Sequence, residues 1–209
     1  MPLLTMLFSY CLVVLPSGAR LCPLIRLLNV GREGSEMQND KPKGSKTFKE
    51  LEKEGWEVRA DTYDYYDSPV TSQAVDNLLE AVDARGGMRL LDVATGTGLI
   101  AGKASSRGIA ATGIDFASSM ISVAKRNYPQ AQFNVGDAEA LPFKDESFNV
   151  VICQFGLGHM ADPDAAIAES YRVLRSGGKY GFTVWGAPDK DYFRGIVVKA
   201  IKTHSGFDD

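Results

Sequence analysis

The sequence has little cysteine, no excess of basic charge and no apolar run of membrane-spanning length. Its three cysteines, Cys11, Cys22 and Cys153, lack the spacing of a metal site, and their odd number argues against a disulfide framework. Lys and Arg total 23 against 26 Asp and Glu, so composition predicts no surface for nucleic acid. These absences favour a cytoplasmic protein with no metal site and no nucleic-acid partner.

The first 45 residues predict an extension outside the fold. Residues 2–16 are strongly apolar, but a stable membrane span needs about 20 residues. One interpretation is a signal peptide, with small residues at 17–19 but without the usual basic start. The other, which we favour, is that translation starts at Met37, where a polar, Lys-rich stretch begins. In both, the folded domain covers residues 46–209.

The most informative stretch is residues 90–98, which read Leu-Leu-Asp-Val-Ala-Thr-Gly-Thr-Gly. A short apolar run ends in a glycine turn, and a new apolar period begins at Leu99, which predicts a strand, a tight loop and a helix. Gly96 and Gly98 permit positive φ and close approach of a ligand, next to the free N–H groups of a helix start. Asp92, inside the apolar run, needs a donor or a cation to face.

S-adenosylmethionine (SAM) suits this acid, because it carries an ammonium group and a sulfonium and no phosphate. A dinucleotide would instead bring a pyrophosphate, which Asp92 would repel. The stretch resembles the first motif of class I SAM-dependent methyltransferases, with Ala94 in place of the first of three glycines. The resemblance implies that Asp92, Ala94 and Thr95, with the backbone of Gly96 and Gly98, hold the methionine portion of SAM.

Two further acids follow predicted strands. Asp115 lies about 20 residues beyond the glycines, where a carboxylate that binds ribose belongs in a βαβ unit. Phe116 beside it offers a flat face to adenine or is a core residue. The run from Gly136 through Asp137 and Ala138 resembles the family's second motif, which implies adenine contacts by these two residues. Met120 completes the expected contacts on this side.

The resemblance adds residues at both ends of the domain. Residues 56–64 resemble the lead-in of the ubiquinone/menaquinone-type branch, where Tyr63 covers either the cofactor or only the core. Gln154 and Phe155 occupy positions that often line the methionine end of the cofactor. His159 is a weak candidate for a base that takes a proton from the acceptor, and a surface histidine at a turn is the alternative.

Strands alternate with helices through the rest of the chain, which predicts an α/β fold with a Rossmann-like, doubly wound, mainly parallel sheet. Class I methyltransferases add two more strands, giving the order 3-2-1-4-5-7-6. Here only a helix over residues 189–204 is expected after the strand at 180–185. The sheet should therefore lack its last two strands, and its bare apolar edge invites self-association.

The favoured function is methyl transfer from SAM to a small-molecule acceptor. Quinone-like rings, sterols and small acids all remain open as acceptors. An NAD(P)-dependent oxidoreductase is the first alternative, because residues 96–101 also satisfy G-x-G-x-x-G/A. The second is a binding module of the same fold without turnover, which the missing strands suggest.

Overall fold

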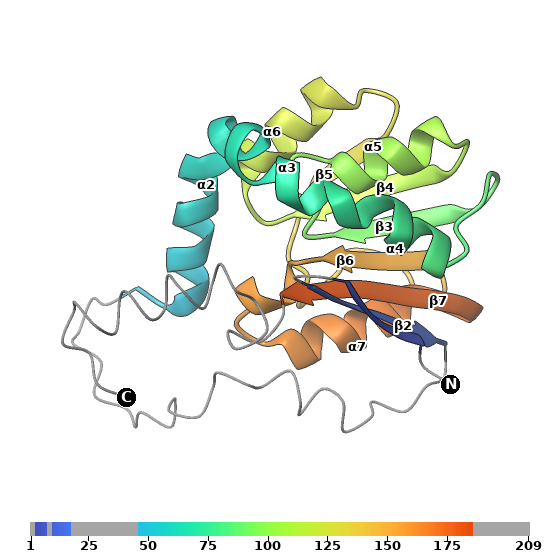
Figure 1. The fold of residues 1–209 in the computed structure, drawn as a ribbon. Helices are drawn as coiled ribbons and strands as arrows, with labels where there is room; N and C mark the ends of the chain where they lie inside the picture. Colours follow the sequence, from blue (N-terminus) through green and yellow to red (C-terminus); the bar gives the residue numbers. More distant parts are fainter. Residues whose placement is uncertain (1–2, 8–9, 18–45, 186–209) are drawn as a thin grey trace.

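The computed structural model describes residues 3–7, 10–17 and 46–185, which contain one seven-stranded sheet in the order β1-β2-β7-β6-β3-β4-β5 (Figure 1). The strands are β1 Leu3–Leu7, β2 Tyr10–Pro16, β3 Arg89–Val93, β4 Ala110–Asp115, β5 Gln132–Val135, β6 Phe148–Gln154 and β7 Leu174–Trp185. The helices are α2 Phe48–Tyr66, α3 Ser68–Thr71, α4 Val75–Ala81, α5 Leu99–Ser106, α6 Ser118–Asn127 and α7 Pro163–Val173, with short 3-10 turns at Ser72–Ala74 and Leu157–His159.

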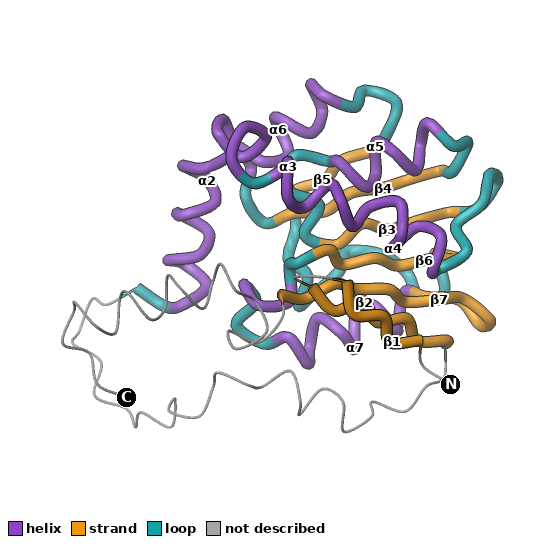
Figure 2. The backbone as a smooth tube through the Cα atoms, in the orientation of Figure 1, coloured by secondary structure: helices purple, strands orange, loops and turns teal. Residues whose placement is uncertain are grey.

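The predicted parallel sheet is present. Strand β3 pairs in parallel with β4 and β6, β4 pairs with β5, and β6 pairs with β7. Helices α4, α5 and α6 lie on one face of this sheet and α7 lies on the other (Figure 2). The carboxyl ends of the parallel strands therefore share one edge, and α2 stands beside that edge (Figure 1).

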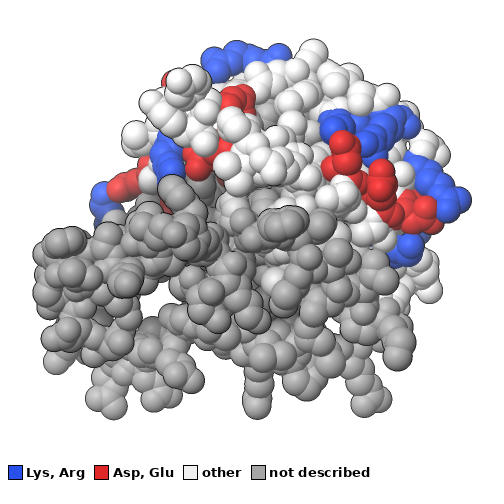
Figure 3. Space-filling model, viewed as in Figure 1, with Lys and Arg blue, Asp and Glu red and all other residues white. Residues whose placement is uncertain are grey.

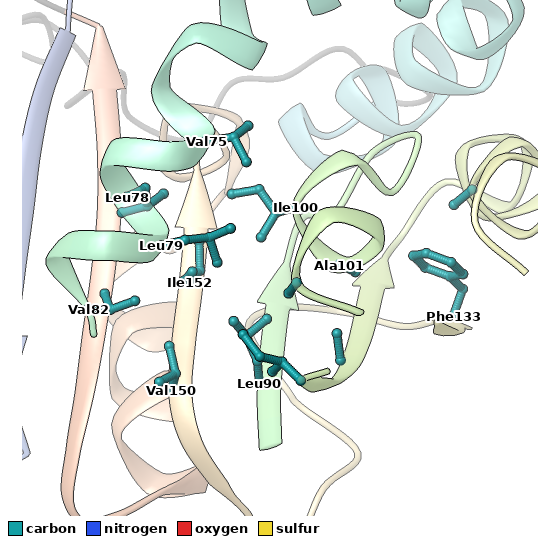
Figure 4. Close-up of a cluster of buried hydrophobic side chains, with 14 of the residues drawn as sticks. Val75, Leu78, Leu79, Val82, Leu90, Ile100, Ala101, Phe133, Val150 and Ile152 are labelled. Atoms are coloured by element: carbon teal, nitrogen blue, oxygen red, sulfur yellow. The ribbon is translucent and has the colours of Figure 1, made fainter. Parts of the chain in front are cut away.

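Helix α4 shows how the apolar period becomes a core. Val75, Leu78, Leu79 and Val82 are spaced i, i+3, i+4 and i+7, and all are at most 1% exposed. They face residues of β6 and α5 within one apolar cluster (Figure 4). This spacing therefore forms the buried face of the helix, and Thr71, which lies in α3, makes no helix cap.

The amino-terminal hairpin corrects two expectations. Strand β2 pairs antiparallel with β7, from Tyr10 opposite Trp185 to Pro16 opposite Lys179, and β1 pairs antiparallel with β2. Residues 3–7 and 10–16 thus belong to the sheet, although the sequence indicated that residues 1–45 lie outside the fold. The edge of β7, which was expected to be bare, is also paired, with β2.

The burial of β2 gives the reason for this correction. Leu12 and Val14 pack with the α4 side of the core, and Val13 packs with the α7 side; they are 3%, 8% and 4% exposed. A strand that is buried on both faces has a continuous apolar sequence, and the sequence of a signal peptide has the same property. In the family's strand order, β2 and β1 fill the positions of strands 7 and 6.

Acidic and basic side chains are interspersed on the face shown in Figure 3. Across the described ranges, no helix has the length and apolar character needed to cross a membrane. The helix expected over 189–204 and the stretch that begins at Met37 lie outside the described residues.

Candidate active site

The loop between β3 and α5 holds three residues in the left-handed region, with φ of 55° at Ala94, 56° at Gly96 and 89° at Gly98. A Cβ at Gly96 would meet nothing within 4 Å, so this glycine faces open space. A Cβ at Gly98 would lie 2.8 Å from the Phe133 ring and 2.9 Å from the Ala124 methyl group. Gly98 therefore serves packing, whereas Gly96 leaves the backbone accessible.

Asp92 is a buried acid that forms no ion pair with the described residues. It is 2% exposed, and its Oδ2 accepts hydrogen bonds from Thr95 Oγ1 at 2.5 Å and from the Ala101 N–H at 3.2 Å. Burial raises its pKa to about 7, against the lowering effect of these hydrogen bonds. None of the ion pairs within the described ranges involves Asp92. A positively charged ligand group would offset the free-energy cost of burying the ionised carboxylate.

Asp115 lies at the tip of the neighbouring strand, β4. Its Oδ2 accepts from the Gly96 N–H at 2.9 Å, and its Oδ1 accepts from the Ala117 N–H at 3.0 Å. The carboxyl group is thus fixed against the glycine loop. Burial raises its pKa to about 6, although both hydrogen bonds act to lower it.

Asp137 follows β5 and has a cationic partner from α2. The Lys49 ammonium group pairs with Asp137 and, at 2.9 Å, with Glu139. Asp137 Oδ1 also accepts from the Glu139 N–H at 3.0 Å. The side chain of Asp137 is 35% exposed, so this acid remains within reach of a ligand.

Two clefts lie along this edge of the sheet, and we name them after their acids. The Asp92 cleft is lined by Tyr63, Thr71, Asp92, Ala94, Thr95, Gly96, Thr97, Leu99, Ile100 and Gln154. The Asp137 cleft is lined by Lys49, Ala94, Ile114, Asp115, Phe116, Gly136, Asp137, Ala138, Glu139, Gly156, His159 and Met160. Because Ala94 lines both, the two clefts meet at the glycine loop.

A family model described as a methyltransferase domain matches residues 91–182, which include the glycine loop and all three acids. Residues 91–182 are a methyltransferase domain. A demethylmenaquinone methyltransferase from Renibacterium salmoninarum is 40% identical over 124 residues, 59% of this chain and 52% of that protein. A ubiquinone/menaquinone biosynthesis C-methyltransferase from Shewanella halifaxensis is 38% identical, over 56% of this chain and 51% of its own. The chain spans about half the length of these relatives.

Solved structures support the fold of the methyltransferase domain. A SAM-dependent methyltransferase from Methanococcus maripaludis aligns with a TM-score of 0.57 at 18% identity, over 79% of this chain and 77% of its own. A methyltransferase in complex with the Trm112 methyltransferase activator of Haloferax volcanii aligns with a TM-score of 0.55 at 25% identity, over 60% of this chain and 57% of its own. The sheet is thus of the class I methyltransferase type.

Helix α2 covers the edge of the methyltransferase domain where the clefts open. It runs without a break from Phe48 to Tyr66, and Thr47 at its N-cap forms a capping box with Glu50. Ala60 is 2% exposed, and Trp56 and Tyr63 pack beside it. The continuous helix carries Tyr63 to the Asp92 cleft and Lys49 to the Asp137 cleft.

Glu57 of α2 caps α6 from outside. Ser118 is the first helical residue of α6, and Ala117 at the cap position has no capping side chain. Glu57 accepts from the backbone N–H groups of Ser118 at 2.7 Å and Ser119 at 2.8 Å. Burial acts to raise the pKa of Glu57, but these hydrogen bonds outweigh it and lower the pKa to about 2.

His159 lies on the Asp137 side of the methyltransferase domain. Its Nδ1 is 2.8 Å from Glu52 Oε2, and its ring meets Trp56 edge-on at 4.9 Å between centroids. Its cleft is the one that also holds Lys49 and Asp137, whereas Gln154 lines the other. The structure thus separates this candidate base from the Asp92 cleft.

The structure brings together most, but not all, of the expected cofactor contacts. Gly98, Met120 and Phe155 line neither cleft. Met120 is 1% exposed in a small apolar cluster, and Phe155 stacks on Trp185 at 4.1 Å. The other expected contacts line one cleft or both. They are Tyr63, Asp92, Ala94, Thr95, Gly96, Asp115, Phe116, Asp137, Ala138 and Gln154.

Sequence reasoning missed several polar residues of the site. Lys49, Glu52 and Glu57 share the inner face of α2, but their charges resemble those of a solvated helix. A signal was present in their i, i+3 and i+8 spacing, which places all three on the side of the helix that carries Trp56. Glu139 directly follows the run that resembles the second motif, and its sequence position alone gave no sign of its pairing with Lys49.

Proposed function

We propose that this chain is a SAM-dependent methyltransferase that acts on a small-molecule acceptor. The observation that carries the proposal is the buried Asp92, which pairs with no cation of the described part of the chain and lies beside a glycine loop, with Asp115 and Asp137 at the ends of the neighbouring strands. Three acids along two joined clefts suit a positively charged nucleoside that lacks phosphate. The match of residues 91–182 to a methyltransferase domain supports the same function.

Each part of the site has a distinct task in this proposal. Asp92 would face the ammonium group, with the Gly96 backbone beside the methionine portion. Asp115 would accept from the ribose hydroxyls, and Asp137 from the exocyclic amine of adenine. Bound SAM supplies an electrophilic methyl group for in-line displacement. The protein's own contribution is to hold donor and acceptor at attack distance and to exclude water beneath α2.

The acceptor we propose is a quinone-type ring. Support comes from the names of the relatives, which are demethylmenaquinone and ubiquinone/menaquinone methyltransferases. The Asp92 cleft would receive the acceptor near Gln154, because ligands of open α/β sheets bind beyond the carboxyl ends of the strands. The free thiols of Cys11 and Cys153 fit the cytoplasm that we propose as its compartment.

Calorimetric titration with S-adenosylhomocysteine (SAH) tests the proposal. Wild-type protein should bind, and Asp115→Ala should weaken binding by about tenfold or more, since a charge-assisted hydrogen bond is lost. Asp61→Ala, at an exposed acid on the outer side of α2, is the matched control and should bind normally. No binding by folded wild-type protein, or equal binding by Asp115→Ala, refutes the cofactor assignment.

Labelled methyl transfer tests the reaction and the acceptor together. Incubation with methyl-labelled SAM and a demethylated naphthoquinol should give a labelled product at the expected mass. A metabolite extract in the same assay identifies another acceptor if the quinol stays unlabelled, and that result excludes the quinone. Binding of NADH in preference to SAH would support the oxidoreductase alternative, which the buried acids beside the loop disfavour.

A further inference from the structure

Asp64, near the end of α2, is held by three hydrogen bonds. Its Oδ1 accepts from Thr97 Oγ1 at 2.6 Å and from Ser68 Oγ at 3.0 Å. Its Oδ2 accepts from Asn127 Nδ2 at 2.8 Å. The carboxylate thus connects α2 to the glycine loop, to the start of α3 and to the end of α6.

The bond to Thr97 differs from the other polar contacts of α2. Thr97 lies between the two loop glycines, is 2% exposed and lines the Asp92 cleft. Lys49 and Glu52 instead reach residues of the Asp137 cleft, and Glu57 reaches the start of α6. Asp64 is therefore the α2 residue that reaches the loop beneath the proposed methionine portion.

The residue before Asp64 gives this bond a consequence. Tyr63 lines the Asp92 cleft from α2, while Thr97 lines it from the loop. Fixing Asp64 to Thr97 sets the position of the Tyr63 ring above the cleft, because the two residues are adjacent on one helical turn. Because the Thr97 hydroxyl donates its proton to Asp64, it cannot donate to another acceptor. This bond therefore helps to fix the orientation of the loop backbone.

We propose that Asp64 is a positioning residue that couples closure of α2 to the shape of the glycine loop. A ligand in the Asp92 cleft and a closed α2 then favour each other, since both need the same loop arrangement. The inference rests on the proposed function, because the ligand it concerns is SAM or SAH. Asp64 contacts no reacting atom in this proposal and acts through Thr97 and Tyr63.

A double-mutant cycle on the full chain tests the coupling. SAH affinity is measured by calorimetry for wild type, Asp64→Ala, Thr97→Val and the double variant. Each single change should weaken SAH binding about tenfold, the lower end for losing a hydrogen bond to a charged group. The double variant should be no more than about threefold weaker than either single variant. Asp64→Asn keeps an acceptor oxygen for Thr97 and should stay within about threefold of wild type.

Hydrogen exchange separates positioning from a general loss of stability. Exchange in residues 48–66 should rise in Asp64→Ala without a matching rise in β3 and β6, and SAH should protect α2 in wild type but not in the variant. The matched control is Asp61→Ala, whose only described ion pair is a 3.6 Å contact to Arg126, and it should behave as wild type.

The outcomes distinguish this inference from the proposed function. If wild type binds SAH and Asp64→Ala binds equally well, the coupling is wrong and the proposed function stands. If the losses in Asp64→Ala and Thr97→Val multiply in the double variant, Asp64 does not act through Thr97. If folded wild type fails to bind SAH, the proposed function is wrong and the coupling falls with it.

Discussion

Leu12→Ala tests whether the amino-terminal hairpin is part of the core. The Leu12 side chain is 3% exposed in β2, within the cluster that includes the buried face of α4. The substitution removes three carbons at about 0.8 kcal/mol each and leaves a cavity, so the free energy of unfolding should fall by about 2–4 kcal/mol. For a chain of this size the midpoint of thermal unfolding should fall by roughly 5–15 °C.

The assay is urea unfolding followed by far-UV circular dichroism, with a thermal melt in the same buffer. Leu51→Ala is the matched control, because it makes the same chemical change on the outer face of α2, where the side chain is 55% exposed. It should change the free energy of unfolding by less than about 0.5 kcal/mol. If the free energy of unfolding of Leu12→Ala falls no more than that of Leu51→Ala, β2 is not a structural strand, and residues 1–45 lie outside the fold after all.

The remaining predictions concern charge, the helix cap, a thiol and the sheet edge. SAH binding should release protons near pH 6.5, because its ammonium group favours the ionised form of Asp92, whose pKa burial raises to about 7. Titration in buffers of different ionisation enthalpy measures this release, and Asp92→Asn should reduce it; an unchanged value contradicts the assignment. Before a ligand binds, the raised pKa values of Asp92 and Asp115 make their contribution to stability greatest below pH 4, and it is lost as pH rises through about 6 to 7. Glu57 has the opposite sign: its contribution is present above about pH 4.5 and lost as pH falls towards 2, so Glu57→Gln should cost about 1 kcal/mol at pH 7 and little at pH 2 in urea melts. The Cys153 thiol, with its pKa raised by burial to about 12, should resist iodoacetamide in the native protein and react after unfolding, as peptide mass spectrometry would show. Labelling at the native rate of a free thiol would mean that β6 opens. A chain that starts at Met37 should expose β7 and associate in light scattering, and a stable monomer would show that the edge needs no cover.

The sequence predicted the central part of the fold because its local signals agree with the tertiary structure. Helix α5, Leu99–Ser106, begins where the apolar period predicted a helix, and Asp137 follows strand β5, Gln132–Val135, as predicted. Glycine turns and proline stops mark those boundaries directly. Asp92 and Asp115 lie at the carboxyl ends of β3 and β4, because the local apolar runs correctly marked where these two strands end.

The parts that could not be predicted depend on contacts between distant segments. The apolar run of β2 suits a signal peptide and a buried strand equally, and only its pairing with β7 decides between them. The roles of Lys49, Glu57 and Asp64 likewise require α2 to lie across the domain. No local pattern within α2 predicts which residues of the domain its side chains contact. Binding of SAM by these contacts stays a prediction.

The hairpin also has a consequence for how the molecule assembles. Tyr10 pairs with Trp185, so this edge of the sheet joins segments near opposite limits of the described chain. During synthesis the apolar segment of β2 emerges long before its neighbour β7, which is the last strand of the described sheet to be made. Contacts of such high sequence separation form slowly, because a long loop must close before they gain anything. Until then the nascent chain exposes a β-prone apolar segment, which makes it a target for chaperones and for aggregation.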